Sequence, residues 1–213
     1  MKFDKGIAKK YRQSIEDAFD TILEKGNGEQ RRVMQAIIDS KMAIYVLPVS
    51  EVEASGVTGL INLARTNERI ASERLSLREA LGEVFITIAK ETIDIGLQRG
   101  CEGTFVHEGR HAYDFAQVIE SFSNLDINPL SIYNPTLYEM EFAAHQTSAE
   151  YLLRMATDEY LQEGVGLMIL SQHEGAHAVS DDGIKRRLRE NYGLTENENQ
   201  GKAVSERFGL VQK

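Results

Sequence analysis

The sequence predicts an α+β protein with helices at both ends and a small sheet between them. Apolar residues recur every three or four positions within residues 1–40. Between about residues 42 and 95 they form short runs or alternate, and helical spacing returns after residue 104. A length of 213 residues fits one domain spanning 1–213.

Residues 1–40 are expected to form a helical hairpin packed on the main body. The first helix is indicated by apolar residues at helical spacing, namely Tyr11, Ile15, Phe19, Ile22 and Leu23. Gly26-Asn27-Gly28 interrupts this pattern. A second short helix follows, with Val33, Met34, Ile37 and Ile38.

The middle of the chain is expected to form three or four strands of a small, mostly antiparallel sheet. Met42–Leu47, Val57–Ala64 and Val84–Ile88 are apolar or β-branched runs, and Thr92–Ile95 alternates. The links between these runs are short, which favours antiparallel pairing of neighbours. The charged stretch Arg65–Arg78 fits either a loop or an exposed edge strand.

The second half is predicted to be helical. One helix is expected from Thr104 to Phe122 and a longer one from Thr136 to Gln162. Ser123–Pro135 between them, with two prolines and three asparagines, is predicted to be a loop. Residues 164–213 are predicted to be a helical, polar tail.

The composition limits the partners that the chain can have. It carries 33 acidic and 24 basic residues, a net charge of -9, which argues against nucleic acid or an anionic membrane as partner. Cys101 is the single cysteine, so an internal disulfide is excluded. No apolar signal core or membrane-spanning stretch is visible, so a cytoplasmic location is expected.

The segment His107-Glu108-Gly109-Arg110-His111 carries the clearest chemistry. His107 and His111 lie four residues apart, so on a helix both imidazoles face one ion. Glu108 lies about 100° around the helix, where it can activate a metal-bound water without binding the metal. Gly109 permits close backbone approach beside a metal. Arg110 is expected to face solvent or to contact a substrate carboxylate.

A zinc site of this kind needs a third protein ligand, and Glu141 is the preferred candidate. Ala144 and Ser148 follow Glu141 at helical spacing, so this helix could lie close to the histidine helix. Glu139 is the alternative ligand. Thr136-Leu137-Tyr138-Glu139 matches a capping box, which gives Glu139 a structural role at the helix start.

From Thr104 to Tyr151, about a quarter of the chain, the sequence resembles the gluzincin class of zinc metallopeptidases. In that class a His-Glu-x-x-His helix is followed by a helix that supplies a glutamate ligand. The matching residues are His107, Glu108, His111 and Glu141. The resemblance implies a zincin-like domain, and a strand that holds the substrate extended, for which Val84–Ile88 or Thr92–Ile95 could serve.

The predicted function is zinc-dependent hydrolysis of a peptide bond in a peptide or protein substrate. Zn2+ is held by His107, His111 and Glu141, and Glu108 is the catalytic base. The alternative is a catalytically inactive regulatory or interaction protein with a metallopeptidase fold. A glutamate at position 108 is unnecessary for metal binding alone, which favours the enzyme. A purely structural helical protein is a further alternative, and the oligomeric state stays open.

His173-Glu174-Gly175-Ala176-His177 repeats the same pattern. The first copy is the preferred metal site, because strands precede it and the Glu141 helix follows it. The second copy is interpreted as an exposed helix or turn with two surface histidines. A ligand there would have little packed support.

Other polar residues are weaker candidates. His145, one turn after Glu141, could stabilise an oxyanion but is interpreted as a packed polar residue. Asp114 could orient a ligand imidazole. Four tyrosines are possible oxyanion donors, each more often structural: Tyr113, Tyr133, Tyr138 and Tyr151.

Overall fold

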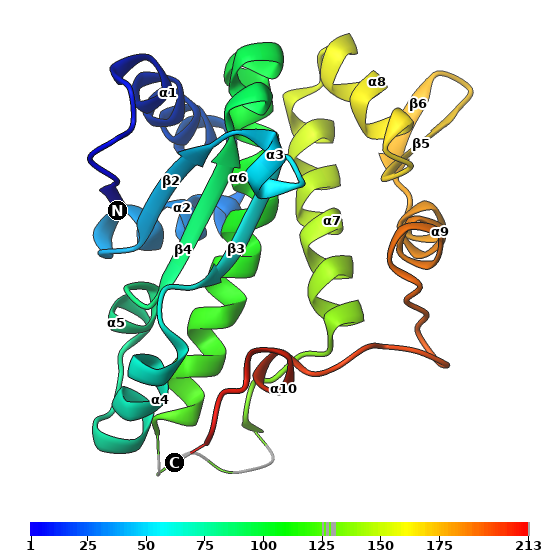
Figure 1. Cartoon of the computed structure of the whole chain (residues 1–213). Helices are drawn as coiled ribbons and strands as arrows, with labels where there is room; N and C mark the ends of the chain where they lie inside the picture. Colours follow the sequence, from blue (N-terminus) through cyan, green and yellow to red (C-terminus); the bar gives the residue numbers. More distant parts are fainter. Residues whose placement is uncertain (125, 127, 129–130, 213) are drawn as a thin grey trace.

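The computed structural model describes residues 1–124, 126, 128 and 131–212. It is α+β, with a four-stranded sheet in front of the long helix α6 and with α7 running beside α6 (Figure 1). The elements in chain order are β1 (Lys2–Phe3), α1 (Lys9–Lys25), α2 (Gly28–Asp39), β2 (Ala43–Leu47), α3 (Val49–Val52), β3 (Gly56–Leu60), α4 (Leu63–Ser72), α5 (Leu77–Leu81), β4 (Val84–Ala89), α6 (Lys90–Phe122), α7 (Leu137–Met155), α8 (Asp158–Gly166), β5 (Leu170–His173), β6 (Ala176–Val179), α9 (Asp181–Tyr192) and α10 (Val204–Phe208).

Helices α1 and α2 occupy the two segments predicted to be helical within residues 1–40. The buried face of α1 packs on α6, where the rings of Phe19 and Phe105 lie 4.9 Å apart. Asn27 caps α2, and Gln30 completes the capping box. The amide of Gln30 also donates to the backbone oxygen of Thr147 on α7. The N-terminal helices therefore support both helices of the second half.

The main sheet is mixed, and the prediction of a mostly antiparallel sheet is wrong. Its strand order is β1-β2-β4-β3, in which β1–β2 and β2–β4 are parallel and β3–β4 is antiparallel. The prediction failed because it assumed that each strand pairs with its neighbour in sequence. Instead β2 pairs with β4, and the intervening chain (α3, β3, α4 and α5) is long enough for a parallel crossover.

The segment Thr92–Ile95 is helical, not a strand, and belongs to the start of α6. Two apolar residues in alternation are too few to separate a strand from a helix, and in the helix Ile93 and Ile95 lie on nearly opposite sides. Ile93 is accordingly buried, whereas Ile95 is 84% exposed. Just beyond it, Leu97 has a left-handed φ of 50° and kinks α6.

The charged stretch Arg65–Arg78 is neither loop nor edge strand but lies within α4, α5 and their link. Two of its arginines hold Glu83, which is fully buried just before β4. Arg65 and Arg69 pair with this carboxylate at 2.7 and 2.6 Å, and the Thr66 hydroxyl donates to it. Burial alone would raise the pKa of Glu83, but these bonds lower it below its usual value.

The C-terminal half departs from the predicted pattern at two places. Helix α7 ends at Ala156, which has a left-handed φ of 55°, so the predicted helix Thr136–Gln162 is broken into α7 and α8. The tail 164–213 contains the antiparallel hairpin β5–β6 besides α9 and α10, so it is not all helical. The predicted loop Ser123–Pro135 includes residues 125, 127, 129 and 130, which lie outside the described residues.

None of the described helices combines the length and apolar character needed to cross a lipid bilayer.

Candidate metal centre

The segment His107 to His111 lies in the middle of α6, the most enclosed helix of the fold. Its flanks, including Phe105, Val106 and Ala112, are buried, because α6 is covered by the sheet on one side and by helices on the others. A Cβ atom on Gly109 would lie 2.5 Å from Cε of Met34 on α2. Gly109 therefore faces α2 and lets the Met34 side chain pack closely on the backbone of α6.

The two histidines of α6 converge as their spacing predicts. The Nε2 atoms of His107 and His111 lie 3.1 Å apart. His111 is buried, and His107 is half-buried beside a cavity. The two imidazoles are thus held at one point on the surface of α6.

Glu141 on α7 meets both histidines. Its Oε2 lies 3.6 Å from Nε2 of His107 and 3.5 Å from Nε2 of His111. This oxygen is buried, and no described group donates a hydrogen bond to it. Glu139 instead accepts from the backbone and hydroxyl of Thr136 in the predicted capping box. The geometry therefore brings Glu141, and not Glu139, to the histidines.

These side chains fit the requirements of a metal ion. Zinc–ligand bonds of about 2.0–2.1 Å in a tetrahedron place neighbouring ligand atoms roughly 3.3 Å apart. The three separations of 3.1, 3.5 and 3.6 Å lie close to this spacing. His107, Glu141 and His145 also offer donor atoms within 4.8 Å of one another. The chain thus has a His-Glu-His cluster that could hold a metal ion, with His111 in the tightest set.

The charges within this cluster are mutually dependent. Burial alone would raise the pKa of Glu141, but its contacts with His107 and His111 lower it well below the usual range. Burial alone would lower the pKa of His111, but Glu141 and the nearby Glu108 raise it. A buried carboxylate facing two imidazoles favours a positive charge between them, which a proton or a cation can supply.

Glu108 is held away from the histidine cluster by the sheet. The hydroxyl of Thr58 on β3 donates to Oε2 of Glu108 at 2.7 Å. Gly56, two residues earlier, lies so close that a Cβ there would come within 3.0 Å of Cγ of Glu108. The strand next to the site is therefore β3, the sheet edge, instead of the predicted Val84–Ile88 or Thr92–Ile95.

A cavity of about 380 Å3 opens beside His107 and Glu108. Its walls come from β3 and the residues before it, α6, α7, α8 and the segment after it, and α9, which contributes Arg187 and Tyr192. Tyr192 lies against His145, with ring centroids 6.3 Å apart. No local sequence pattern indicates Thr58, Arg187 or Tyr192, because each reaches the site only through tertiary packing.

His145 is buried on α7, with its ring 4.8 Å from that of His107. Its Nε2 is buried without a hydrogen-bond partner among the described residues. Burial and the charges of His107 and Arg187 lower the pKa of His145 to about 3. The sequence predicts a packed polar residue at this position. His145 is packed, but its Nε2 is also left without a hydrogen-bond partner beside the cluster in the described part of the chain.

The polar partners predicted around the motif are engaged elsewhere. The guanidinium of Arg110, whose side chain is 19% exposed, pairs with Asp114 at 3.0 Å and with Glu29 at 2.7 Å and lies outside the lining of the cavity beside His107. Asp114 also accepts from the hydroxyl of Tyr133, and no hydrogen bond joins it to His111 in the described residues. The hydroxyl of Tyr151 donates to the buried Glu102. Asp114, Tyr133 and Tyr151 therefore make their hydrogen bonds away from the histidines.

The second copy of the motif lies on the hairpin β5–β6 and forms no helix. Glu174 and Gly175 occupy its turn, with φ of 49° and 82°, as a two-residue hairpin requires. His173 pairs with Ala176, and His177 pairs with Gln172. Paired residues share a face and successive residues alternate, so the two histidines point to opposite faces. They cannot converge on one ion.

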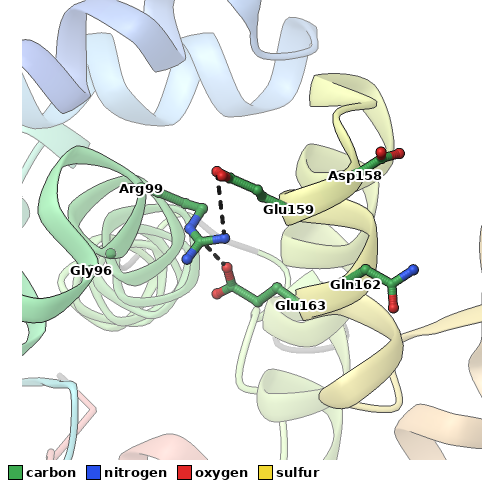
Figure 2. A pocket seen from close by; sticks show the side chains of 7 residues that line it. Gly96, Arg99, Asp158, Glu159, Gln162 and Glu163 are labelled. Carbon is green, nitrogen blue, oxygen red and sulfur yellow. Dashed lines mark ion pairs between the residues drawn. The ribbon is translucent and has the colours of Figure 1, made fainter.

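A larger hollow of about 620 Å3 lies further out, between the start of α6 and α8. Figure 2 shows Arg99 of α6 reaching between Glu159 and Glu163 of α8, at 3.9 and 3.5 Å. None of the clustered histidines lines this hollow. Gly100 and Glu163 line both hollows, so the outer one adjoins the cavity beside His107.

No protein-family model matches the chain, and comparisons with curated proteins and with solved structures give no significant match either. Any function assigned to the chain therefore has to come from the residues of this site.

Proposed function

We propose that the chain is a zinc-dependent hydrolase that cleaves peptide bonds. One observation carries the proposal: His107, His111 and Glu141 converge, while the adjacent Glu108 is held apart at the same cavity. Metal-assisted hydrolysis requires three protein ligands that hold the metal and a separate carboxylate that acts as the base. A site for metal binding alone has no need of Glu108.

The side chains divide the chemistry between them. Zinc at this cluster would lower the pKa of a bound water and polarise a carbonyl oxygen. Glu108 accepts the proton of the attacking water and returns it to the leaving amine. Its hydrogen bond from Thr58 is made through Oε2, which leaves Oε1 for this proton transfer. His145, neutral and unpaired, can donate a hydrogen bond to a developing oxyanion.

The edge strand β3 offers a way to bind a peptide. It pairs with β4 on one side and ends the described sheet on the other. An extended peptide can add to such an edge through backbone hydrogen bonds. Gly56 of β3 lines the cavity, and Thr58 holds Glu108, so a peptide paired there would pass the proposed base.

The test compares Glu108→Gln with the parent. Metal content is measured by elemental analysis, and cleavage is measured by mass spectrometry on a peptide mixture. We expect one zinc per chain in both proteins, and a fall in cleavage of about 100-fold or more in the variant, the size of a general-base contribution. His111→Ala should lose the zinc, whereas His173→Ala with His177→Ala should keep both zinc and cleavage.

Two results would contradict the proposal. Stoichiometric zinc without cleavage of any peptide by the parent would favour the inactive regulatory alternative. A parent protein that binds no zinc, or that retains zinc after His111→Ala, would remove the metal from this cluster.

A further inference from the structure

Arg187 stands out among the residues that line the cavity beside His107. Among the described residues it is the only lysine or arginine in that lining. No described carboxylate lies within ion-pair distance of it, whereas Glu163, also in the lining, pairs with Arg99. Glu108, the other carboxylate of the lining, accepts from Thr58 and makes no ion pair with Arg187 in the described residues. A half-buried cation without an ion pair is unusual, because burying an unpaired charge is costly.

The guanidinium of Arg187 is almost unused by the fold. It has five N–H donors. The structure gives it one hydrogen bond within the described residues, a long one of 3.4 Å to the backbone oxygen of Leu167. Its Nε is buried and has no partner. These donors are therefore available to an acceptor that enters the cavity.

The surroundings of Arg187 favour an anionic acceptor on an apolar body. Leu152, Leu167 and Ile169 supply apolar wall, and Tyr192 supplies a phenol. The cavity of about 380 Å3 is within the usual range for small ligands. A planar guanidinium with parallel donors matches the two oxygens of a carboxylate.

We propose that Arg187 binds a carboxylate of the substrate, so that the cavity accepts the C-terminal end of a peptide or an acidic side chain. This inference rests on the proposed function, because it places the carboxylate next to the bond to be cleaved. Both sources offer the same chemistry.

The test measures binding by calorimetry, in a Glu108→Gln background in which turnover does not interfere. The probes are N-acetyl-leucyl-alanine as the free acid and as its C-terminal amide. A second pair, N-acetyl-glutamyl-alanine amide and its glutaminyl counterpart, tests an acidic side chain. Each probe is titrated into the protein as isolated and after treatment with a chelator, so that binding to metal is separated from binding to Arg187.

In one of the two pairs, we expect the acid to bind at least about tenfold more tightly than its neutral counterpart. This is the usual contribution of a charge-assisted hydrogen bond. Arg187→Gln should abolish this preference, and Arg187→Lys should keep part of it. Arg186→Gln is the matched control, because it removes the same charge from the neighbouring residue of α9, which is exposed and outside the cavity lining. Circular dichroism confirms that each variant is folded.

A carboxylate preference that survives Arg187→Gln would overturn the inference. So would a preference that is lost equally in Arg186→Gln. A third contradicting result is that none of the four probes binds at millimolar concentration. Failure of the hydrolase proposal would look different. An Arg187-dependent preference that persists in chelated protein, together with a parent that cleaves no peptide, would keep the carboxylate site and refute the enzyme.

Discussion

Zinc should stabilise the folded chain, because its proposed ligands come from two helices. His107 and His111 lie on α6 and Glu141 lies on α7, so an ion there links elements that unfolding separates. At a free zinc concentration 100 times Kd, the stabilisation is about 2.7 kcal/mol. Since 1 kcal/mol shifts Tm by about 2–4 °C in a chain of this size, zinc should raise Tm by roughly 5–11 °C.

Glu141→Gln is the perturbation that tests the link between the helices. It replaces the charged ligand by a neutral amide of the same shape and leaves both histidines in place. An affinity about 100-fold weaker would leave roughly 0.4 kcal/mol of stabilisation at the same zinc concentration, a shift of about 1–2 °C. Glu139→Gln is the control, because Glu139 is exposed and its carboxylate accepts only from Thr136 in the helix cap.

The assay is a thermal melt followed by circular dichroism, with chelated protein and with added zinc. The control should melt at a lower temperature than the parent without zinc, since it weakens a helix cap, but its zinc-induced shift should equal that of the parent. An equal shift in Glu141→Gln and the parent would refute the assignment of Glu141. A shift lost only in His173→Ala with His177→Ala would place the ion on the hairpin.

Two further predictions concern residues that support the site, and a third concerns the stability of the fold. Thr58→Val should reduce cleavage at least tenfold with zinc retained, because it removes a hydrogen bond of about 1.5–3 kcal/mol from Glu108. Gly56→Val should block the cavity and reduce peptide binding, because its Cβ would lie 2.5 Å from a Thr104 methyl group. Glu83→Gln should lower the free energy of unfolding in urea by about 1.5–3 kcal/mol, since it weakens the charge-assisted hydrogen bonds from Arg65 and Arg69. Because the folded pKa of Glu83 is lowered, this contribution is present at neutral pH and is lost in acid, below the usual carboxyl pKa.

The convergence of His107, His111 and Glu141 could be anticipated because each step rests on local information. Four-residue spacing places two histidines on one helix face whatever the rest of the fold does. The capping box assigned Glu139 to the helix start, which left Glu141 free to face α6. Helical periodicity and capping are properties of short segments, so the sequence carries them.

The other features of the site depend on long-range packing. Thr58 meets Glu108 only because β3 lies at the sheet edge next to α6, and the sheet order could not be predicted from the short links. Arg187 lies in the segment 164–213, for which the sequence predicts a helical, polar tail. The tail instead returns to the start of α7, where Ala203 bridges Thr136, and so α9 closes one side of the cavity.

The two copies of His-Glu-Gly-x-His show what decides whether such a pattern can bind metal. Both have glycine third, yet Gly109 is helical and Gly175 adopts a φ of 82° in a hairpin turn. The difference lies in the flanks. The first copy is preceded by Phe105 and Val106, which are buried, so tertiary packing maintains the helix despite the glycine. The second follows Ser171 and Gln172, which are exposed, so the turn preference of glycine prevails. The spacing brings two imidazoles together only where burial enforces the helix.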